Sequence, residues 1–185
     1  MSVIQSLLDE YKRYKAMTEA AVSQVSDADL ARLGPAGGNS IDMLIRHVAG
    51  NLKSRFTDFR TSDGEKSWRR RDDEFETASL HRAELMASWE SAWTTVLDEV
   101  SQLTDADLAK TVTVRQQPLR IDEALHRSLA HTAYHVGQIV YLAKEMRGDA
   151  WRTLSIPKGK SAEYNRNATR ETAAAHAEML KDGKT

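Results

Sequence analysis

The chain has 185 residues, 41% of them hydrophobic and 29% charged, and its 26 basic and 27 acidic residues give a net charge of -1. This composition is typical of a globular protein and lacks the basic excess of nucleic-acid-binding proteins, so we expect no nucleic-acid partner. The chain has no cysteine, which excludes disulfides, thiolate metal ligands and cysteine nucleophiles.

The N-terminal sequence MSVIQSLLDEYKRYK lacks the charged and apolar regions of a secretory signal. No apolar run approaches the ~20 residues of a membrane-spanning helix. We therefore expect a cytoplasmic protein with no membrane partner.

Apolar residues recur at helical spacing in four segments, which predicts four long amphipathic helices. The segments are about residues 2–25, 40–56, 79–103 and 121–147. Ser40 is suited to cap the second segment, and the fourth ends before Gly148. Four such helices predict an all-α fold, a four-helix bundle.

Three other segments complete the expected architecture. Residues 61–76 are long and polar, and their simplest interpretation is a solvated crossover loop. Thr111–Arg120 alternates apolar and polar residues, which predicts a short β-hairpin before the 121–147 helix. The C-terminal extension, 148–185, is too apolar for a free linker, and its strong helix formers predict a fifth helix.

We expect one domain over residues 1–185, with a core of about 2–147 and a tail of 148–185 that packs on the bundle. Within the tail, Leu154, Ile156 and Tyr164 are apolar anchors, and Pro157 and Gly159 shape a turn. This part of the tail is expected near the functional site or at a dimer interface.

A short sequence occurs twice. Ser26–Leu30 reads SDADL and Thr104–Leu108 reads TDADL, and each precedes an Ile-Asp pair that opens a helix. One interpretation is a duplicated helix pair, which would give a bundle with pseudo-twofold symmetry. The other is chance similarity between helix-capping sequences.

His131 and His135 are four residues apart in SLAHTAYHVGQIVYLAK, so both imidazoles project from one face of the 121–147 helix. They lie beside its apolar face and are expected to point into or along the bundle interior. Two imidazoles at this spacing are a common way for a helix to hold a transition metal. Hydrogen-bonded core histidines and surface histidines are the alternatives.

His47 lies beside the core face of the 40–56 helix. Together with His131 and His135 it would form a three-histidine site with at least one open position, as in catalytic metal sites. A single structural histidine is the alternative. Asn51 and Gln138, one turn beyond His47 and His135, are candidates for hydrogen bonds to the ligands or for substrate contacts, with simple packing as the alternative.

The remaining candidates are less specific. His81 and His126 fall on polar helix faces and are expected at the surface, and His176 is expected to be an ordinary helix residue. Four basic residues are candidates for binding an anionic cofactor, although such residues are usually solvated: Arg55, Arg60, Lys158 and Lys160.

Three stretches resemble the DinB/YfiT-like family of bundle metalloproteins: RHVAGNLKSRFTDFRTSDGEKSWRRRDDEF, LAHTAYHVGQIVYLAK and WRTLSIPKGKSAEYN. The resemblance covers about residues 5–165. It implies a four-helix bundle that binds one divalent metal through His47, His131 and His135. Members of that family are often homodimers, and relatives with known chemistry include transferases and isomerases that use bacillithiol or mycothiol.

These observations predict a metal-dependent enzyme that acts on a small-molecule substrate, with thiol transfer as the first choice of chemistry. Three imidazoles suit zinc, nickel, iron or copper. Zinc or nickel is the expected metal, with iron as the next choice. A low-molecular-weight thiol is the expected cosubstrate, and the catalytic residues beyond the metal ligands are not identified. The alternatives are a metal-dependent hydrolase, a non-catalytic bundle that binds a metal or another ligand, and a metal-free interaction protein with structural histidines.

Overall fold

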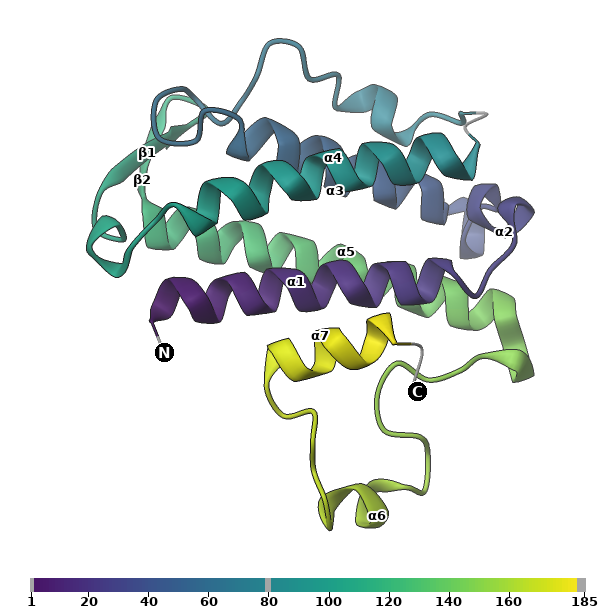
Figure 1. Cartoon of the computed structure of the whole chain (residues 1–185). Coiled ribbons are helices and arrows are strands. Elements are labelled where there is room, and N and C mark those ends of the chain that lie inside the picture. Colours follow the sequence, from purple (N-terminus) through teal and green to yellow (C-terminus); the bar gives the residue numbers. More distant parts are fainter. Residues whose placement is uncertain (1, 79–80, 183–185) are drawn as a thin grey trace.

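The computed structural model describes residues 2–78 and 81–182, and four long helices lie side by side in it (Figure 1). They are α1 (Val3–Val22), α3 (Ile41–Phe56), α4 (Arg82–Ser101) and α5 (Ile121–Arg147). The all-α fold and the four-helix bundle predicted from the sequence are confirmed. Among the described helices, none has both the length and the apolar composition needed to cross a bilayer.

Shorter elements connect and extend the bundle. The short α-helices are α2 (Asp27–Ala31), α6 (Ser161–Asn165) and α7 (Ala173–Lys181). The strands are β1 (Thr111–Val114) and β2 (Gln117–Arg120), and the 3₁₀ turns are η1 (Pro35–Gly37), η2 (Asp72–Phe75), η3 (Asp105–Asp107) and η4 (Gly148–Ala150).

Most helix ends agree with the prediction. The Ser40 hydroxyl caps α3 by accepting a hydrogen bond from the Met43 N–H, and α5 ends before Gly148, which has a φ of 57°. α1 ends at Val22, about one turn early, because Ser26 and Asp29 form a capping box that begins α2. The start expected for α4, at Ser79, lies outside the described residues.

The repeated sequence corresponds to repeated structure. Thr104 and Asp107 form the same capping box before η3 that Ser26 and Asp29 form before α2. In the bundle, α1 packs on α5 and α3 packs on α4. If α1 and α3 are one copy of a helix pair and α4 and α5 the other, the α1–α5 contact of one arrangement corresponds to the α4–α3 contact of the other. This symmetry favours a duplicated helix pair over chance similarity.

The predicted hairpin is confirmed. β1 and β2 pair antiparallel with Val114 opposite Gln117. Arg115 and Gln116 form the two-residue turn, with φ of 53° and 61°. Two positive φ values are those of a type I′ turn, the geometry that matches strand twist.

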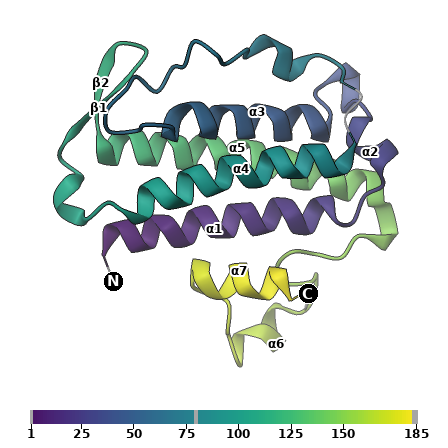
Figure 2. The same cartoon turned by 45° about the horizontal axis from the view of Figure 1, so that its top comes forward.

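α3 and α4 run in the same direction, so the chain must return along the bundle between them (Figures 1 and 2). Residues 57–78, the crossover loop, make this return. The Asp63 carboxylate ties it to the hairpin by accepting hydrogen bonds from the N–H groups of Arg115 and Gln116, at 2.8 and 2.6 Å. Arg46 of α3 ties its far end by donating to the carbonyl oxygens of Asp73 and Glu76.

An apolar centre holds the four helices together. It consists of Tyr11, Phe56, Trp89 and Trp93, each with at most 1% of its surface exposed. The Tyr11 ring of α1 meets Phe56 of α3 and Trp93 of α4 edge to face, both at 6.2 Å between centroids. The Tyr11 hydroxyl donates a hydrogen bond to the Leu125 carbonyl of α5 at 2.9 Å, so one side chain contacts all three other helices.

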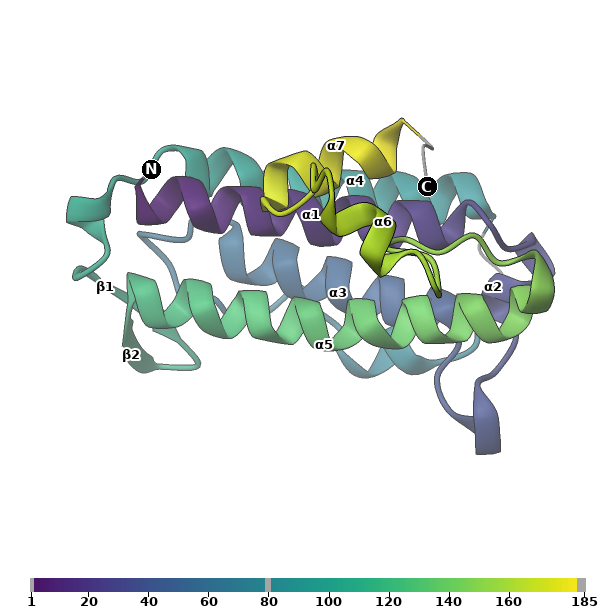
Figure 3. The same cartoon turned by 90° about the horizontal axis from the view of Figure 1, so that it is seen from below.

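The C-terminal extension packs on α1 through α7, on the side of the bundle away from the crossover loop (Figures 1 and 3). The fifth helix is thereby confirmed. Leu154 is buried, and its carbonyl accepts a hydrogen bond from His176 Nε2 at 2.7 Å. The expected place for Leu154–Asn165 near the histidines is wrong, because no residue of this segment lines the cavity beside them. Its place at a dimer interface and the one-domain organisation stay predictions.

Candidate metal centre

Three histidines converge between α3 and α5, and we call them the histidine cluster: His47, His131 and His135. His131 and His135 are one turn apart on α5, with ring centroids 4.6 Å apart. His47 faces them from α3, with its centroid 5.1 Å from that of His131 and 4.8 Å from that of His135. His47 is 4% exposed and His135 9% exposed, while His131 is partly exposed, so the cluster lies at the edge of the core.

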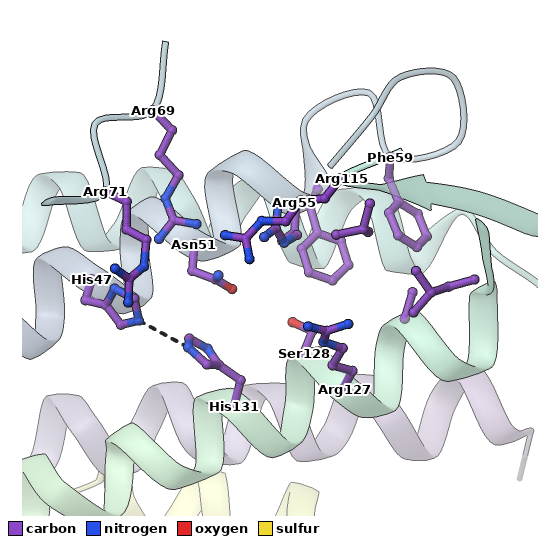
Figure 4. A pocket seen from close by; sticks show the side chains of 14 residues that line it. His47, Asn51, Arg55, Phe59, Arg69, Arg71, Arg115, Arg127, Ser128 and His131 are labelled. Atoms are coloured by element: carbon purple, nitrogen blue, oxygen red, sulfur yellow. Dashed lines mark hydrogen bonds between the residues drawn. The ribbon is translucent and has the colours of Figure 1, made fainter. Parts of the chain in front are cut away.

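The cluster has the spacing of a metal site. Each histidine offers a ring nitrogen, and these three atoms all lie within 4.8 Å of one another. His47 Nε2 and His131 Nε2 are 3.1 Å apart, drawn as the dashed line in Figure 4. Zinc–nitrogen bonds of about 2.0–2.1 Å place two tetrahedral ligands about 3.3 Å apart. The side chains present therefore fit a divalent transition metal.

A buried ion pair orients His47. Its Nδ1–H donates to Glu74 Oε2 at 2.8 Å, and Arg69 donates to both oxygens of the same carboxylate at 2.8 and 2.9 Å. The Arg69 side chain is only 2% exposed and that of Glu74 is 10% exposed. With its Nδ1 engaged, His47 presents Nε2 to the cluster, as in the carboxylate–histidine–metal arrangements of known metalloproteins.

Gly50 makes room for this ion pair. A Cβ added to Gly50 would overlap the Glu74 carboxylate and would lie 3.7 Å from Arg69 Nε. Gly50 has no side chain at the point where the crossover loop packs against α3, so Glu74 can reach His47, one helical turn from Gly50.

Gln138 orients the second histidine. Its Oε1 accepts a hydrogen bond from His135 Nδ1 at 2.7 Å, which leaves His135 Nε2 for the cluster. Asn51, the other amide considered from the sequence, lines the cavity beside His47 and His131. His131 differs from both other histidines, since its buried Nδ1 has no hydrogen-bond partner in the described chain.

The electrostatics favour the protonation states that metal binding requires. Burial lowers the pKa of His131 to about 4, and the nearby His135 and His47 act in the same direction. Burial also lowers the pKa of His135, against the effect of the Gln138 hydrogen bond. Burial opposes ionisation of Glu74, but hydrogen bonds from His47 and Arg69 hold its pKa below the ordinary value. Neutral imidazole donors beside an ionised carboxylate are suited to a cation.

His47 and His131 lie at one end of a cavity of about 220 Å³ between α3, α5, the crossover loop and the hairpin (Figure 4). Five arginines line it: Arg55, Arg69, Arg71, Arg115 and Arg127. Phe56, Phe59 and Leu119 give it an apolar part.

The other sequence candidates lie elsewhere. His81 and His126 are exposed, as expected. Arg60 pairs with Glu99 at 2.8 Å, and Lys160 pairs with Glu163 at 2.8 Å. Of the four basic residues considered for an anionic cofactor, only Arg55 lines the cavity.

Interpreting residues 61–76 as a solvated loop agrees with the exposed residues 70–73 and is wrong for Arg69 and Glu74. The side chains of Glu74 and Arg69 can be buried there because the Glu74 carboxylate accepts hydrogen bonds from both His47 and Arg69. Sequence reasoning missed both residues, along with Arg71, Arg115 and Arg127. The run SWRRRDDEF carried a signal, since it concentrates opposite charges in the segment that passes the histidines.

Comparison with known proteins identifies the family but not a function. No curated protein and no solved structure matches the chain. A family model described as "Protein of unknown function (DUF1572)" matches residues 1–160. The chain therefore belongs to the DUF1572 family.

Proposed function

We propose that this protein binds one divalent transition metal through His47, His131 and His135 and uses it in thiol-dependent transfer chemistry on a small molecule. The observation that carries the proposal is the convergence of three imidazoles, two of which have Nδ1 engaged by Glu74 and Gln138. The resemblance to DinB/YfiT-like proteins supports the same ligand set and the choice of chemistry. Zinc or nickel is the proposed metal, with iron as the next choice.

A divalent cation supplies Lewis-acid chemistry that turns a thiol or a water molecule into a nucleophile near neutral pH. The chain itself has no cysteine, and Glu74 is engaged by His47 and Arg69. An external thiol is therefore the simplest nucleophile. In the transfer, a carbon–sulfur bond forms as the bond from carbon to the leaving group breaks, and the thiol proton passes to solvent. His47, His131 and His135 would hold the metal at the end of the cavity.

Metal analysis of the protein purified without an affinity tag tests the binding step. We expect one divalent metal per chain, and we expect His131→Ala to lose most of it because two histidines make a poor site. His81→Ala and His126→Ala are matched controls on the surface and should retain the metal. Full metal occupancy in His131→Ala would contradict the proposed ligand set.

A thiol panel assayed against a model electrophile tests the reaction class. Turnover should need both metal and added thiol, and His135→Ala should abolish it. Unchanged turnover in the metal-stripped protein would refute the mechanism. Turnover with metal but without thiol would identify the hydrolase alternative, and inactivity across the panel would favour a bundle that binds metal without catalysis.

The resemblance also supports a homodimer, and we propose a cytoplasmic location as well. Both stay predictions. Sedimentation analysis of the purified protein would test the first, and localisation of a tagged chain in cells would test the second.

A further inference from the structure

The arginines around the cavity come from four separate parts of the chain. Arg55 is on α3, Arg69 and Arg71 on the crossover loop, Arg115 in the hairpin turn and Arg127 on α5. Figure 4 shows Arg55 and Arg127 in the middle of the cavity, between His47 and His131 at one end and Phe59 at the other. We call the five residues the arginine pocket. A solvated face of one helix would place arginines along that helix alone. These arginines come from four segments and meet around one cavity.

The positive charge of the arginine pocket is only partly neutralised. Glu65 pairs with Arg55 and Arg115, at 3.1 and 2.7 Å, and Glu74 pairs with Arg69. Among the carboxylates of the described residues, Arg71 pairs only with the highly exposed Asp72, at 3.6 Å. Arg127 has no ion pair or hydrogen bond from its guanidinium within residues 2–78 and 81–182. No carboxylate is among the described residues that line the cavity.

The excess charge also acts on neighbouring groups. Burial lowers the pKa of Arg55 against its contact with Glu65, and Arg115 and Arg69 lower it further. An anion in the cavity would relieve this repulsion between cations. Guanidinium groups bind carboxylate and phosphate oxygens through paired hydrogen bonds, which makes arginine suited to these anions.

The other lining residues restrict the shape of the anion. Phe56 and Phe59 line the cavity with stacked rings, 5.1 Å between centroids, but are only 1% and 4% exposed, whereas Val114 and Leu119 of the same lining are partly exposed. A bare inorganic ion would leave the exposed parts of Val114 and Leu119 in contact with water. An anion with an apolar body would cover them.

We propose that the arginine pocket binds a small organic anion, a carboxylate or phosphate joined to an apolar group, and presents it to the histidine cluster as substrate. The role as substrate rests on the proposed function, whereas the binding of the anion does not. The anionic group lies against Arg127, Arg55 and Arg71, and the apolar group lies on Val114 and Leu119.

Isothermal titration calorimetry with three probes that share a phenyl ring tests this proposal: benzoate, phenyl phosphate and benzamide, which is a neutral isostere of benzoate. Titrations into metal-free protein exclude direct coordination of the probe by metal. We expect benzoate or phenyl phosphate to bind at least about tenfold more tightly than benzamide, because charge-assisted hydrogen bonds are lost with the neutral probe. The stronger of the two anions identifies the natural group as carboxylate or phosphate.

Arg127→Gln should weaken the preferred anion about tenfold without affecting benzamide. Its side chain is exposed and unpaired, so the variant should fold, which circular dichroism would check. Arg147→Gln, an exposed arginine at the other end of α5, removes the same charge and should bind like the unchanged protein.

Equal affinity for all three probes, no binding of any probe, or equal effects of the two substitutions would overturn the proposal. These outcomes concern the metal-free protein, so they do not depend on the metal analysis. If the protein binds anions but carries no metal, the arginine pocket stands and the proposed function fails.

Discussion

The apolar centre and the histidine cluster lie within the same bundle, yet different interactions hold their side chains. Around Tyr11, helices α1, α3 and α4 supply aromatic rings that pack together, and α5 supplies the backbone carbonyl that accepts a hydrogen bond from the Tyr11 hydroxyl. Around His47, two helices supply imidazoles, and the crossover loop supplies the buried ion pair that orients one of them. Packing therefore determines the position of the helices, whereas a loop outside the bundle completes the candidate metal centre.

This difference means that stability and metal affinity should respond to different residues. A substitution in the apolar centre should change the free energy of unfolding with the metal site intact. A substitution around the histidine cluster should change metal affinity more than it changes the fold.

The largest effect on stability is expected from Trp93→Ala. Trp93 is fully buried against Tyr11 and Trp89, and truncating such a side chain leaves a cavity that costs about 3–5 kcal/mol. Chemical denaturation followed by circular dichroism measures this loss. The folded fraction should still bind metal as the unchanged protein does. A loss of metal affinity at full folding would show that the two regions are coupled.

Glu74→Gln should weaken metal binding about 10- to 100-fold, the usual effect of removing a carboxylate that orients a histidine ligand. It should also lower stability, because Arg69 would keep its burial but lose its charge partner. Competition with a chelator measures the affinity. Glu65→Gln is the matched control, since Glu65 pairs with arginines of the same cavity but contacts no histidine. Equal effects of the two substitutions would contradict the role assigned to Glu74.

The same contrast explains what the sequence could predict. The bundle was predictable because each long helix carries an apolar stripe of helical period, and Ser40 and Gly148 mark helix ends. The histidines were predictable as a set because regular helices fix which face each side chain occupies.

Glu74 and the arginine pocket were not predictable in this way. The crossover loop contains several carboxylates, and loop backbone has no fixed period that tells which of them turns inward. Only the path of the loop along α3, and the space left by Gly50, select Glu74. The five arginines meet because the hairpin turn and the loop are tied together by Asp63, a long-range contact with no local sequence signal.

Gly50→Ala tests whether the space left by Gly50 lets Glu74 reach His47. Alanine normally stabilises a helix by up to about 1 kcal/mol relative to glycine, but here its Cβ would displace the Glu74 carboxylate from His47. We expect metal affinity to fall toward that of Glu74→Gln, although less completely. Gly137→Ala, in the middle of α5, has no atom within 4 Å of the added Cβ and should raise stability with metal affinity unchanged. Unchanged metal affinity in Gly50→Ala would show that the ion pair adjusts without effect on His47.

The smallest effect is expected from Tyr11→Phe, which removes only the hydroxyl that donates to the Leu125 carbonyl. At about pH 7 the loss should be about 0.5–1.5 kcal/mol of unfolding free energy, the value of one buried hydrogen bond. Burial raises the pKa of Tyr11 above its ordinary value of 10.0. The unfolded chain then releases this proton at lower pH than the folded chain, so the stability linked to it is complete below about pH 10 and is lost as the pH rises further.

Denaturation at about pH 7 and pH 11 measures both effects of Tyr11→Phe. The stability difference between the unchanged protein and the variant should shrink at the higher pH, because only the unchanged protein carries the buried phenol. Tyr141→Phe is the control, since Tyr141 is 65% exposed on α5 and should show little difference at either pH. A stability difference for Tyr11→Phe that is the same at both pH values would mean that the phenol titrates alike in the folded and unfolded chains. The apolar centre would then be open to solvent, and its contrast with the histidine cluster at the edge of the core would fail.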